Sequence, residues 1–167
     1  MRPSLTICRY QARDWPSVWT MLQAAFAAGD TYAYAPETTE AEAHDIWVKS
    51  PLATYVTVDG DGNVIGTYIL KQNQPGLGSH VCNCGYVVTP GAQGRGIGAA
   101  MCEHSQSEAR SMGFRSMQFN FVVSTNTRAV HLWQKLGFRI VGTLPGAFRH
   151  KVLGDVDAHV MFKHLDR

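Results

Sequence analysis

The chain has 167 residues, of which 45% are hydrophobic and 17% charged, and its formal net charge is +2. This length suits one domain, residues 1–167, with a hydrophobic core of its own. The small net charge and the lack of a basic block argue against nucleic acid or an anionic membrane surface as a partner. No apolar run approaches membrane-spanning length, and the N-terminus lacks the apolar segment of a signal peptide, so we expect a cytoplasmic protein.

The four cysteines are interpreted as reduced thiols. Cys82 and Cys84 stand two apart in a strand-like run, so their side chains share a face and are poorly placed to bridge one another. Without a secretory signal, a reducing compartment is the simpler interpretation for Cys8 and Cys102 as well. Cys-x-Cys with His80 nearby is too sparse a ligand set for zinc, and we expect no metal site.

Turn residues and hydrophobic periodicity predict the elements of the first half of the chain. Asp14 can cap a helix that Gly29 ends. Thr39 and Glu42 form a capping box for a second, short helix, and the segment 59–63, Asp-Gly-Asp-Gly-Asn, is a hairpin signal. The predicted strands are Leu5–Arg9, Thr54–Val58 and Val64–Leu70, the helices run from Asp14 to Gly29 and from Thr39 through Trp47, and the loops are Asp30–Glu37 and Gln72–Ser79.

The second half of the chain alternates strands with helices. Gly113 and Gly137 end the two helices, and the last strand alternates apolar and polar residues with a period of two. The predicted strands are His80–Val88, Ser116–Val122, Phe138–Thr143 and Val156–Lys163, and the helices run from about Gly96 to Met112 and from Asn126 to Leu136. This order, without repeats or linkers, predicts one α+β domain with a mixed sheet.

A glycine-rich loop, Gln93 to Gly98, stands between a strand and a helix start, where free backbone N–H groups and the helix dipole favour a phosphate. A nucleotide P-loop would end in Gly-Lys-Ser or Gly-Lys-Thr, which is missing here. A Rossmann loop would have Gly-x-Gly-x-x-Gly near a first strand, and both spacing and position differ. The pyrophosphate of coenzyme A is the third candidate, and a tight turn without a ligand is the structural alternative.

Two motifs support the coenzyme A interpretation. Gln93-x-x-Gly96-x-Gly98 follows a strand ending in Val-Val-x-Pro, and segment 126–138 reads Asn-x-x-Ala-x-x-Leu-Trp-x-Lys-Leu-Gly-Phe. Together, in this order, they resemble the two signatures of the Gcn5-related N-acetyltransferases, the GNAT superfamily. The resemblance spans nearly the whole chain. It implies the GNAT fold, an α+β arrangement of about seven strands with a splay after the fourth, flanked by about four helices.

A closer resemblance concerns the acceptor. Segments 117–126 and 141–145 are similar to those of fungal and bacterial enzymes that acetylate azetidine-2-carboxylate and related proline analogues. This implies direct transfer of acetyl from acetyl-CoA to the amine of a small amino acid, in a role of amino acid analogue detoxification. Alternatives are another small amine (phosphinothricin-like, or a polyamine, although no acidic cluster marks the acceptor loops), a protein substrate, or a non-catalytic acyl-CoA-binding module. Many GNAT proteins dimerise, so a homodimer is expected.

The family resemblance also implies residues for the acetyl-CoA side of the site. Backbone at Val87 and Val88 would be exposed by the splay and pair with the pantetheine arm, and a backbone N–H near Val88 would polarise the thioester carbonyl. Asn126 would touch the pantetheine arm, cap a helix, or do both. The guanidinium of Arg95 would contact the diphosphate, or be only a solvated loop charge. Amides of the whole loop would hold the diphosphate: Gln93, Gly94, Arg95, Gly96, Ile97 and Gly98.

On the acceptor side the chain departs from the family pattern at two positions. Asn83 stands where many members have a glutamate base, so it can orient substrate or water but cannot usefully accept a proton; alternatively it is a polar residue on a solvent-facing strand face. Trp133 stands where a tyrosine often protonates the thiolate, and it is either an indole donor or a core residue. Asn120, an asparagine amid apolar strand residues, is predicted to be a site residue.

Loops over the acceptor site should meet the substrate carboxylate. Tyr32 and Tyr34 are candidates in the loop after the first helix. Arg149 and His150 are candidates in a loop before the last strand. Each of the four, taken alone, is more often a surface residue.

Overall fold

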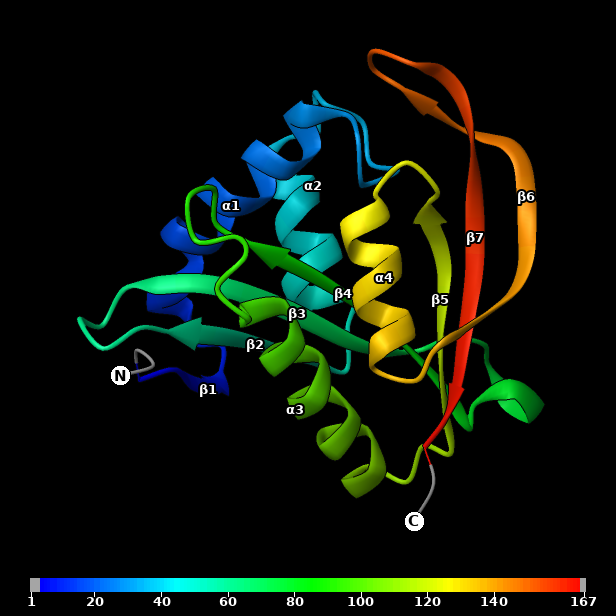
Figure 1. Ribbon diagram of the computed structural model, residues 1–167. Helices are drawn as coiled ribbons and strands as arrows, with labels where there is room; N and C mark the ends of the chain where they lie inside the picture. Colours follow the sequence, from blue (N-terminus) through cyan, green and yellow to red (C-terminus); the bar gives the residue numbers. More distant parts are fainter. Residues whose placement is uncertain (1–3, 166–167) are drawn as a thin grey trace.

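The computed structural model describes residues 4–165, which form one seven-stranded sheet with the strand order β1-β2-β3-β4-β5-β7-β6 (Figure 1). Strands β4 and β5 are parallel, and the other neighbours are antiparallel. The expected α+β fold with a mixed sheet is confirmed. The strands are β1 Thr6–Arg9, β2 Ala53–Val58, β3 Val64–Gln72, β4 Val81–Val88, β5 Ser116–Val123, β6 Arg139–His150 and β7 Gly154–His164, and the helices are α1 Trp15–Ala28, α2 Glu40–His44, α3 Ile97–Ser111 and α4 Thr127–Lys135. Three short elements complete the fold: 3₁₀ turns at Ala12–Asp14 and Gly76–Gly78, and a π-helical turn at Asp45–Lys49.

Helices α1 and α2 cover one face of the sheet, and α3 and α4 cover the other (Figure 1). Each face has its own buried cluster, because successive side chains of a strand point to opposite faces. Strand β4 belongs to both: Cys82 and Cys84 pack with α3 and α4, whereas Val87 packs with α1 and α2. Asn83 alternates with these cysteines and therefore points to the α1/α2 face.

Local signals set the boundaries of the first helices as expected. Gly29 ends α1 in the left-handed conformation with φ +63° and donates its N–H to the carbonyl of Phe26. Thr39 and Glu42 form the predicted capping box of α2. Asp14 does not cap α1 with its side chain, because its carboxylate accepts the N–H of Gln11 at 2.8 Å.

Strand β6 is longer than the prediction, which ended it at Thr143. The ladder with β7 continues to His150 through a register shift between Leu144 and Phe148. Pro145 and Gly146 fall inside that irregular stretch. Since β6 is an edge strand, a proline without an N–H interrupts no ladder on its outer side. The Pro-Gly pair therefore marks a bulge rather than the end of the strand.

Candidate active site

The central feature of the site is a gap between β4 and β5. The two strands pair only at Val81 with Ser116 and at Cys82 with Met117, although both continue for several residues beyond. From Asn83 onward, one edge of β4 has no strand partner. The predicted splay of the fourth strand is therefore present, with its closed end at Cys82.

The register with β3 determines which backbone groups of β4 face this gap. Directly opposite residues of an antiparallel pair alternate between bonded and non-bonded pairs. Thr89 donates its N–H to Ile65 at 2.9 Å, and the β3–β4 register runs without a shift. Alternation places the backbone groups of Tyr86 and Val88 toward the gap. The expectation for Val87 is wrong in this respect, because its N–H and C=O point to β3.

Tyr32 reaches into the gap from the loop after α1. Its hydroxyl donates to the Tyr86 carbonyl at 2.6 Å, and its ring contacts Phe26 and Trp47 with centroids 5.9 and 6.2 Å away. A Cβ at Gly85 would lie 3.4 Å from this hydroxyl, so the glycine leaves room for the phenol. Burial is the largest cause that raises the pKa of Tyr32 well above its ordinary value. The group is therefore a hydrogen-bond donor at neutral pH and not a base.

Tyr34 lies beside Tyr32 and serves mainly to pack it. The two rings stack with centroids 6.3 Å apart, and the Tyr34 ring also lies 5.1 Å from that of Phe26. Both predicted loop tyrosines are thus next to one another, but only Tyr32 bonds to the backbone of the gap.

The glycine-rich loop joins the open end of β4 to α3. Gly94 and Gly96 both have φ +79°, and a Cβ at either position would meet no atom within 4 Å. The first helical bond is donated by Ala100 to Gly96 at 3.0 Å. Within residues 4–165, no backbone acceptor is found for the N–H groups from Gln93 to Gly98. Exposed amides at a helix start form a site that fits a diphosphate.

The last two glycines of the loop have different roles. Gly96 provides the left-handed turn before α3, whereas Gly98 permits close packing, since a Cβ there would lie 3.4 Å from Leu132 of α4. Arg95 is exposed and lies near enough to Asp59 of the β2–β3 hairpin to help hold the pKa of that carboxyl below its ordinary value, after the larger effect of the Asn63 backbone N–H. Arg95 therefore stands beside the exposed amides with one acidic neighbour.

Amide side chains line the α1/α2 side of the gap at its closed end. Asn83 donates from Nδ2 to the carbonyl of Gln118 across the gap at 2.8 Å, which leaves its Oδ1 for a further donor. Asn120 is exposed, accepts from Gln118 Nε2 at 2.9 Å, and donates to Asn73 Oδ1 at 2.7 Å. The two predicted asparagines are thus brought together by one hydrogen-bonded row.

The second signature motif lies at α4. Asn126 is the N-cap, and its Oδ1 accepts the N–H of Ala129 at 3.4 Å. Trp133 packs against Tyr86 and Phe119 with ring centroids 5.1 Å away in each case, and it lies half-buried against the core. No acidic or basic side chain takes the position of the family tyrosine on α4.

Comparison with known proteins agrees with this geometry. Residues 15–138 match the model of the acetyltransferase (GNAT) family. The chain belongs to the GNAT family. It is 31% identical over 153 residues to the N-acetyltransferase aca1 of Schizosaccharomyces pombe, in an alignment that covers 82% of this chain and 73% of that protein. It is therefore an N-acetyltransferase that uses acetyl-CoA as its acetyl donor.

Solved structures of GNAT proteins superpose closely on this fold. The Gcn5-related N-acetyltransferase of Kribbella flavida has a TM-score of 0.91 and 43% identity, covering 96% of this chain and 97% of that one. A phosphinothricin acetyltransferase of Sinorhizobium meliloti, solved with acetyl-CoA, has a TM-score of 0.82 and 21% identity, covering 98% of this chain and 89% of that one. At that lower identity the likeness concerns the fold alone.

The structure corrects the placement of Arg149 and His150, which were expected in a loop over the GNAT acceptor site. Both lie in β6. Arg149 is 91% exposed and pairs with Asp155 at 3.7 Å. Nδ1 of His150 accepts the N–H groups of Val152 and Leu153, both at 3.1 Å, so this histidine fixes the β6–β7 turn. The ring of His150 is thus occupied by the turn, whereas Arg149 stays exposed beside Asp155.

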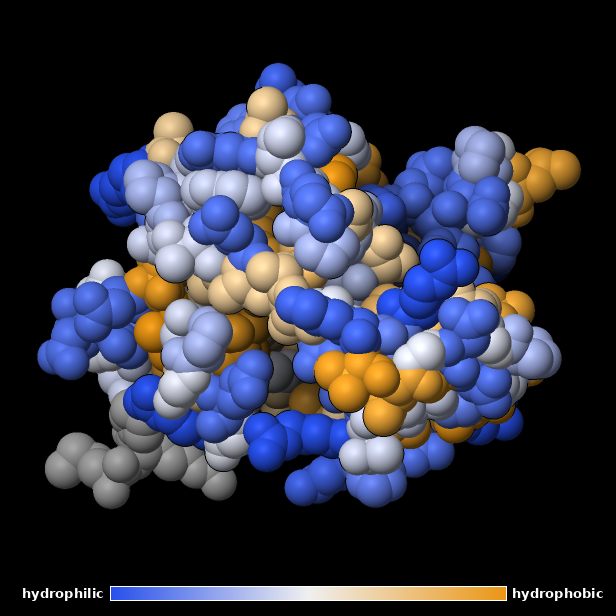
Figure 2. Space-filling view, turned by 90° about the horizontal axis from the view of Figure 1, so that it is seen from above, coloured by the Kyte–Doolittle hydropathy of each residue, from blue (hydrophilic) through white to orange (hydrophobic). Residues whose placement is uncertain are grey.

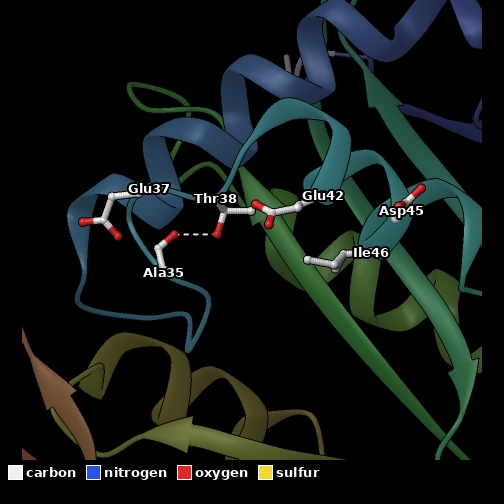
Figure 3. A pocket seen from close by; sticks show the side chains of 6 residues that line it. All are labelled: Ala35, Glu37, Thr38, Glu42, Asp45 and Ile46. Carbon is white, nitrogen blue, oxygen red and sulfur yellow. Dashed lines mark hydrogen bonds between the residues drawn. The ribbon is translucent and has the colours of Figure 1, made fainter.

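An open hollow of about 540 Å³ lies beside α2, lined by residues between Ala35 and Ile46 (Figure 3). Its acidic side chains are mostly committed to local structure. Glu42 accepts the N–H of Thr39 at 2.8 Å, and Asp45 pairs with Lys49 at 2.9 Å. Three carboxylates border the hollow: Glu37, Glu42 and Asp45.

Two kinds of feature are missing from residues 4–165. No group of three or more His, Cys, Asp or Glu side chains is placed to hold a metal ion. No helix has the length and apolar character needed to cross a bilayer.

Several site residues escaped the sequence analysis. The strand register shows that the backbone of Tyr86 faces the gap. The hydrogen bonds show that Gln118 and Asn73 join Asn83 and Asn120 in one row of amides, called the amide row below. The only sequence signal for Gln118 is its spacing of two from Asn120 on the same strand, which places both side chains on one face.

Proposed function

We propose that this GNAT enzyme transfers acetyl directly from acetyl-CoA to the amine of a small amino acid, for example a proline analogue such as azetidine-2-carboxylate. The observation that supports this most is the gap itself, which has backbone donors along one wall and neutral amides at its closed end. The acceptor amine attacks the thioester carbonyl carbon, a C–N bond forms, and the C–S bond breaks. The amine proton passes to solvent, and the thiolate leaves.

Backbone N–H groups at the gap would supply the main stabilisation of this reaction. The N–H groups of Val88 and Tyr86 point into the gap, where the thioester oxygen would accept from them. Removal of one such donor typically raises a barrier by about 2.7–4 kcal/mol. The amides from Gln93 to Gly98, with Arg95 beside them, would hold the diphosphate, and Asn126 would contact the pantetheine arm while capping α4.

No carboxylate base is proposed for the acceptor side. Asn83 is uncharged, and its free Oδ1 would accept an N–H of the amine and orient it. Asn120 would contact the substrate from β5, and Tyr32 and Tyr34 would close the site from the loop after α1. Rate enhancement would then come from orientation and from stabilisation of the oxyanion rather than from a dedicated base or acid.

A thiol-release assay with acetyl-CoA tests the acceptor. The panel would contain azetidine-2-carboxylate, other small amino acids, phosphinothricin, polyamines and peptides. We expect the highest kcat/KM among the small amino acids. Activity confined to polyamines or peptides would reject the substrate assignment, and acetyl-CoA binding without turnover of any amine would favour a non-catalytic acyl-CoA-binding module.

We further propose that the protein detoxifies amino acid analogues in the cytoplasm as a homodimer. The cysteines support a reducing compartment, since all four are free and three are buried. The edge strand β6 supports dimerisation, because it exposes Ile140, Val141 and Leu144. From above, however, hydrophobic side chains form separate patches on a largely hydrophilic surface (Figure 2). Light scattering on the purified protein would determine the oligomeric state.

A further inference from the structure

Lys71 faces the amide row without a structural role of its own. It lies directly opposite Asn83 in the β3–β4 register, and directly opposite residues project from the same face of a sheet. The side chain is half-buried. Among the residues that the structure describes, no ion pair or hydrogen bond involves its ammonium group. A lysine on the same sheet face as a row of neutral amides, without an acidic partner in residues 4–165, is available to bind an anion.

The amide row has a direction that ends in a second free donor. Gln118 donates to Asn120, and Asn120 donates to Oδ1 of Asn73. The NH₂ group of Asn73 is consequently the terminal donor of the row, and no acceptor for it is found in residues 4–165. Aligned amides polarise one another, which strengthens the last donor.

We propose that Lys71 and the Asn73 amide form a subsite for the carboxylate of the acceptor. This deepens the proposed function, on which it rests, by assigning the acceptor to amines that carry a carboxylate. His150 is bonded to the β6–β7 turn, and Arg149 points into solvent beside Asp155, so neither has been placed at the closed end of the gap. Lys71 and Asn73 are the groups proposed there instead.

The distance along β4 between the subsite and the backbone donors suits a small amino acid. Asn83 and the gap-facing Tyr86 are three residues apart, which is about 10 Å of strand. A small amino acid and the flexible lysine side chain together cover this span. The amine then lies toward the backbone donors of Tyr86 and Val88, and the carboxylate lies toward Lys71 and Asn73.

Paired substrates and matched variants test the subsite. Each active amino acid is assayed beside its methyl ester, which keeps the amine but lacks the negative charge. Lys71→Met removes the ammonium and keeps an apolar stem. Asn73→Asp keeps the oxygen that accepts from Asn120 but replaces the terminal donor with a negative charge.

Lys49→Met serves as the control. It also removes a lysine's positive charge, but from an exposed residue that pairs with Asp45.

The wild-type enzyme is expected to prefer each free acid over its ester. In Lys71→Met and Asn73→Asp, kcat/KM for the acids should fall about 10- to 100-fold, as loss of a charge-assisted hydrogen bond predicts. In both variants kcat/KM for the esters and the acetyl-CoA Kd should stay near wild type. The control Lys49→Met should leave kcat/KM for both acids and esters unchanged.

Two results would overturn the subsite and leave acetyl transfer to amines intact. One is a wild-type enzyme that turns over esters as readily as acids. The other is a Lys71→Met variant that loses acids and esters equally, which would indicate a structural role. Absence of thiol release with every acid and every ester would instead overturn the proposed function, and the subsite with it.

Discussion

Asn83 is the first residue of β4 beyond the pairing with β5, and its amide connects the two strands across the closed end of the gap. We expect Asn83→Ala and Asn120→Ala to lower kcat/KM for the acceptor by about 10-fold or more each, because each removes a polar group that we propose positions the amine. The Kd for acetyl-CoA should change little, since neither residue lies in the glycine-rich loop. Steady-state kinetics and calorimetry separate the two effects.

Asn63→Ala is the control for these asparagine variants. Asn63 lies in the β2–β3 hairpin and donates its side-chain N–H to Asp59 at 3.2 Å. Its replacement should leave acceptor kinetics unchanged. Wild-type turnover in both Asn83→Ala and Asn120→Ala would contradict their place in the acceptor site.

Tyr32 offers a test of the hydrogen bond inside the gap. Tyr32→Phe keeps the ring contacts with Phe26 and Trp47 but leaves the Tyr86 carbonyl without its donor. We expect the free energy of unfolding to fall by about 1–3 kcal/mol and acceptor kcat/KM to fall as well. In Tyr34→Phe both quantities should change less, because no hydrogen bond of its hydroxyl is found within residues 4–165. Urea denaturation and steady-state kinetics of the two variants measure both quantities. Equal losses in Tyr32→Phe and Tyr34→Phe would contradict a special role for the Tyr32 hydrogen bond to Tyr86.

At the scale of elements, the two ends of α3 allow a matched comparison. Gly96 precedes the helix with φ +79°, Gly113 follows it with φ +90°, and a Cβ at either would meet nothing within 4 Å. Alanine at each position therefore incurs a similar backbone cost of about 1–2 kcal/mol. Only Gly96→Ala should also weaken acetyl-CoA binding, because it alters the amides that we propose hold the diphosphate. Calorimetry showing equal affinity for the two variants would remove the loop from the binding site.

Most elements could be predicted because their signals are local. Capping residues, terminal glycines and the hairpin segment 59–63 act on neighbouring backbone and need no tertiary contact. The end of β6 could not be predicted, since Pro145 and Gly146 read as a loop until the strand is known to lie at the edge of the sheet. The continuation of α2 as a π-helical turn, Asp45–Lys49, had no sequence signal either.

At the scale of the whole molecule, the site depends on strand register, which the sequence does not show. Asn83 and Asn120 could be selected by their chemistry. Their connection through Gln118, and the bond from Asn120 to Asn73, required the order of β3, β4 and β5 in the sheet. Lys71 looked like any strand lysine until the register placed it opposite Asn83. The residues proposed for the acetyl-CoA side lie in one contiguous loop that a motif can mark, whereas those proposed for the acceptor side come from distant segments that only the fold brings together.

The stability of the whole fold should depend on pH in the alkaline range through its buried tyrosines. The hydroxyl of Tyr55 donates to Glu108 at 2.6 Å, and burial followed by this hydrogen bond raises the pKa of Tyr55 to about 12 from an ordinary 10.0. Below pH 10 the phenol is protonated in both states, so its contribution to stability is complete. Between pH 10 and 12 the unfolded chain loses the proton first, and stability falls as pH rises. Tyr55→Phe should be less stable at pH 7 by about 1 kcal/mol, yet lose less stability between pH 10 and 12 than the wild type. Urea denaturation across this range gives the free energy of unfolding against pH for the wild type and for Tyr55→Phe. The two proteins share every other ionisable group, so the difference between their slopes reports Tyr55. Parallel curves would contradict the raised pKa of Tyr55.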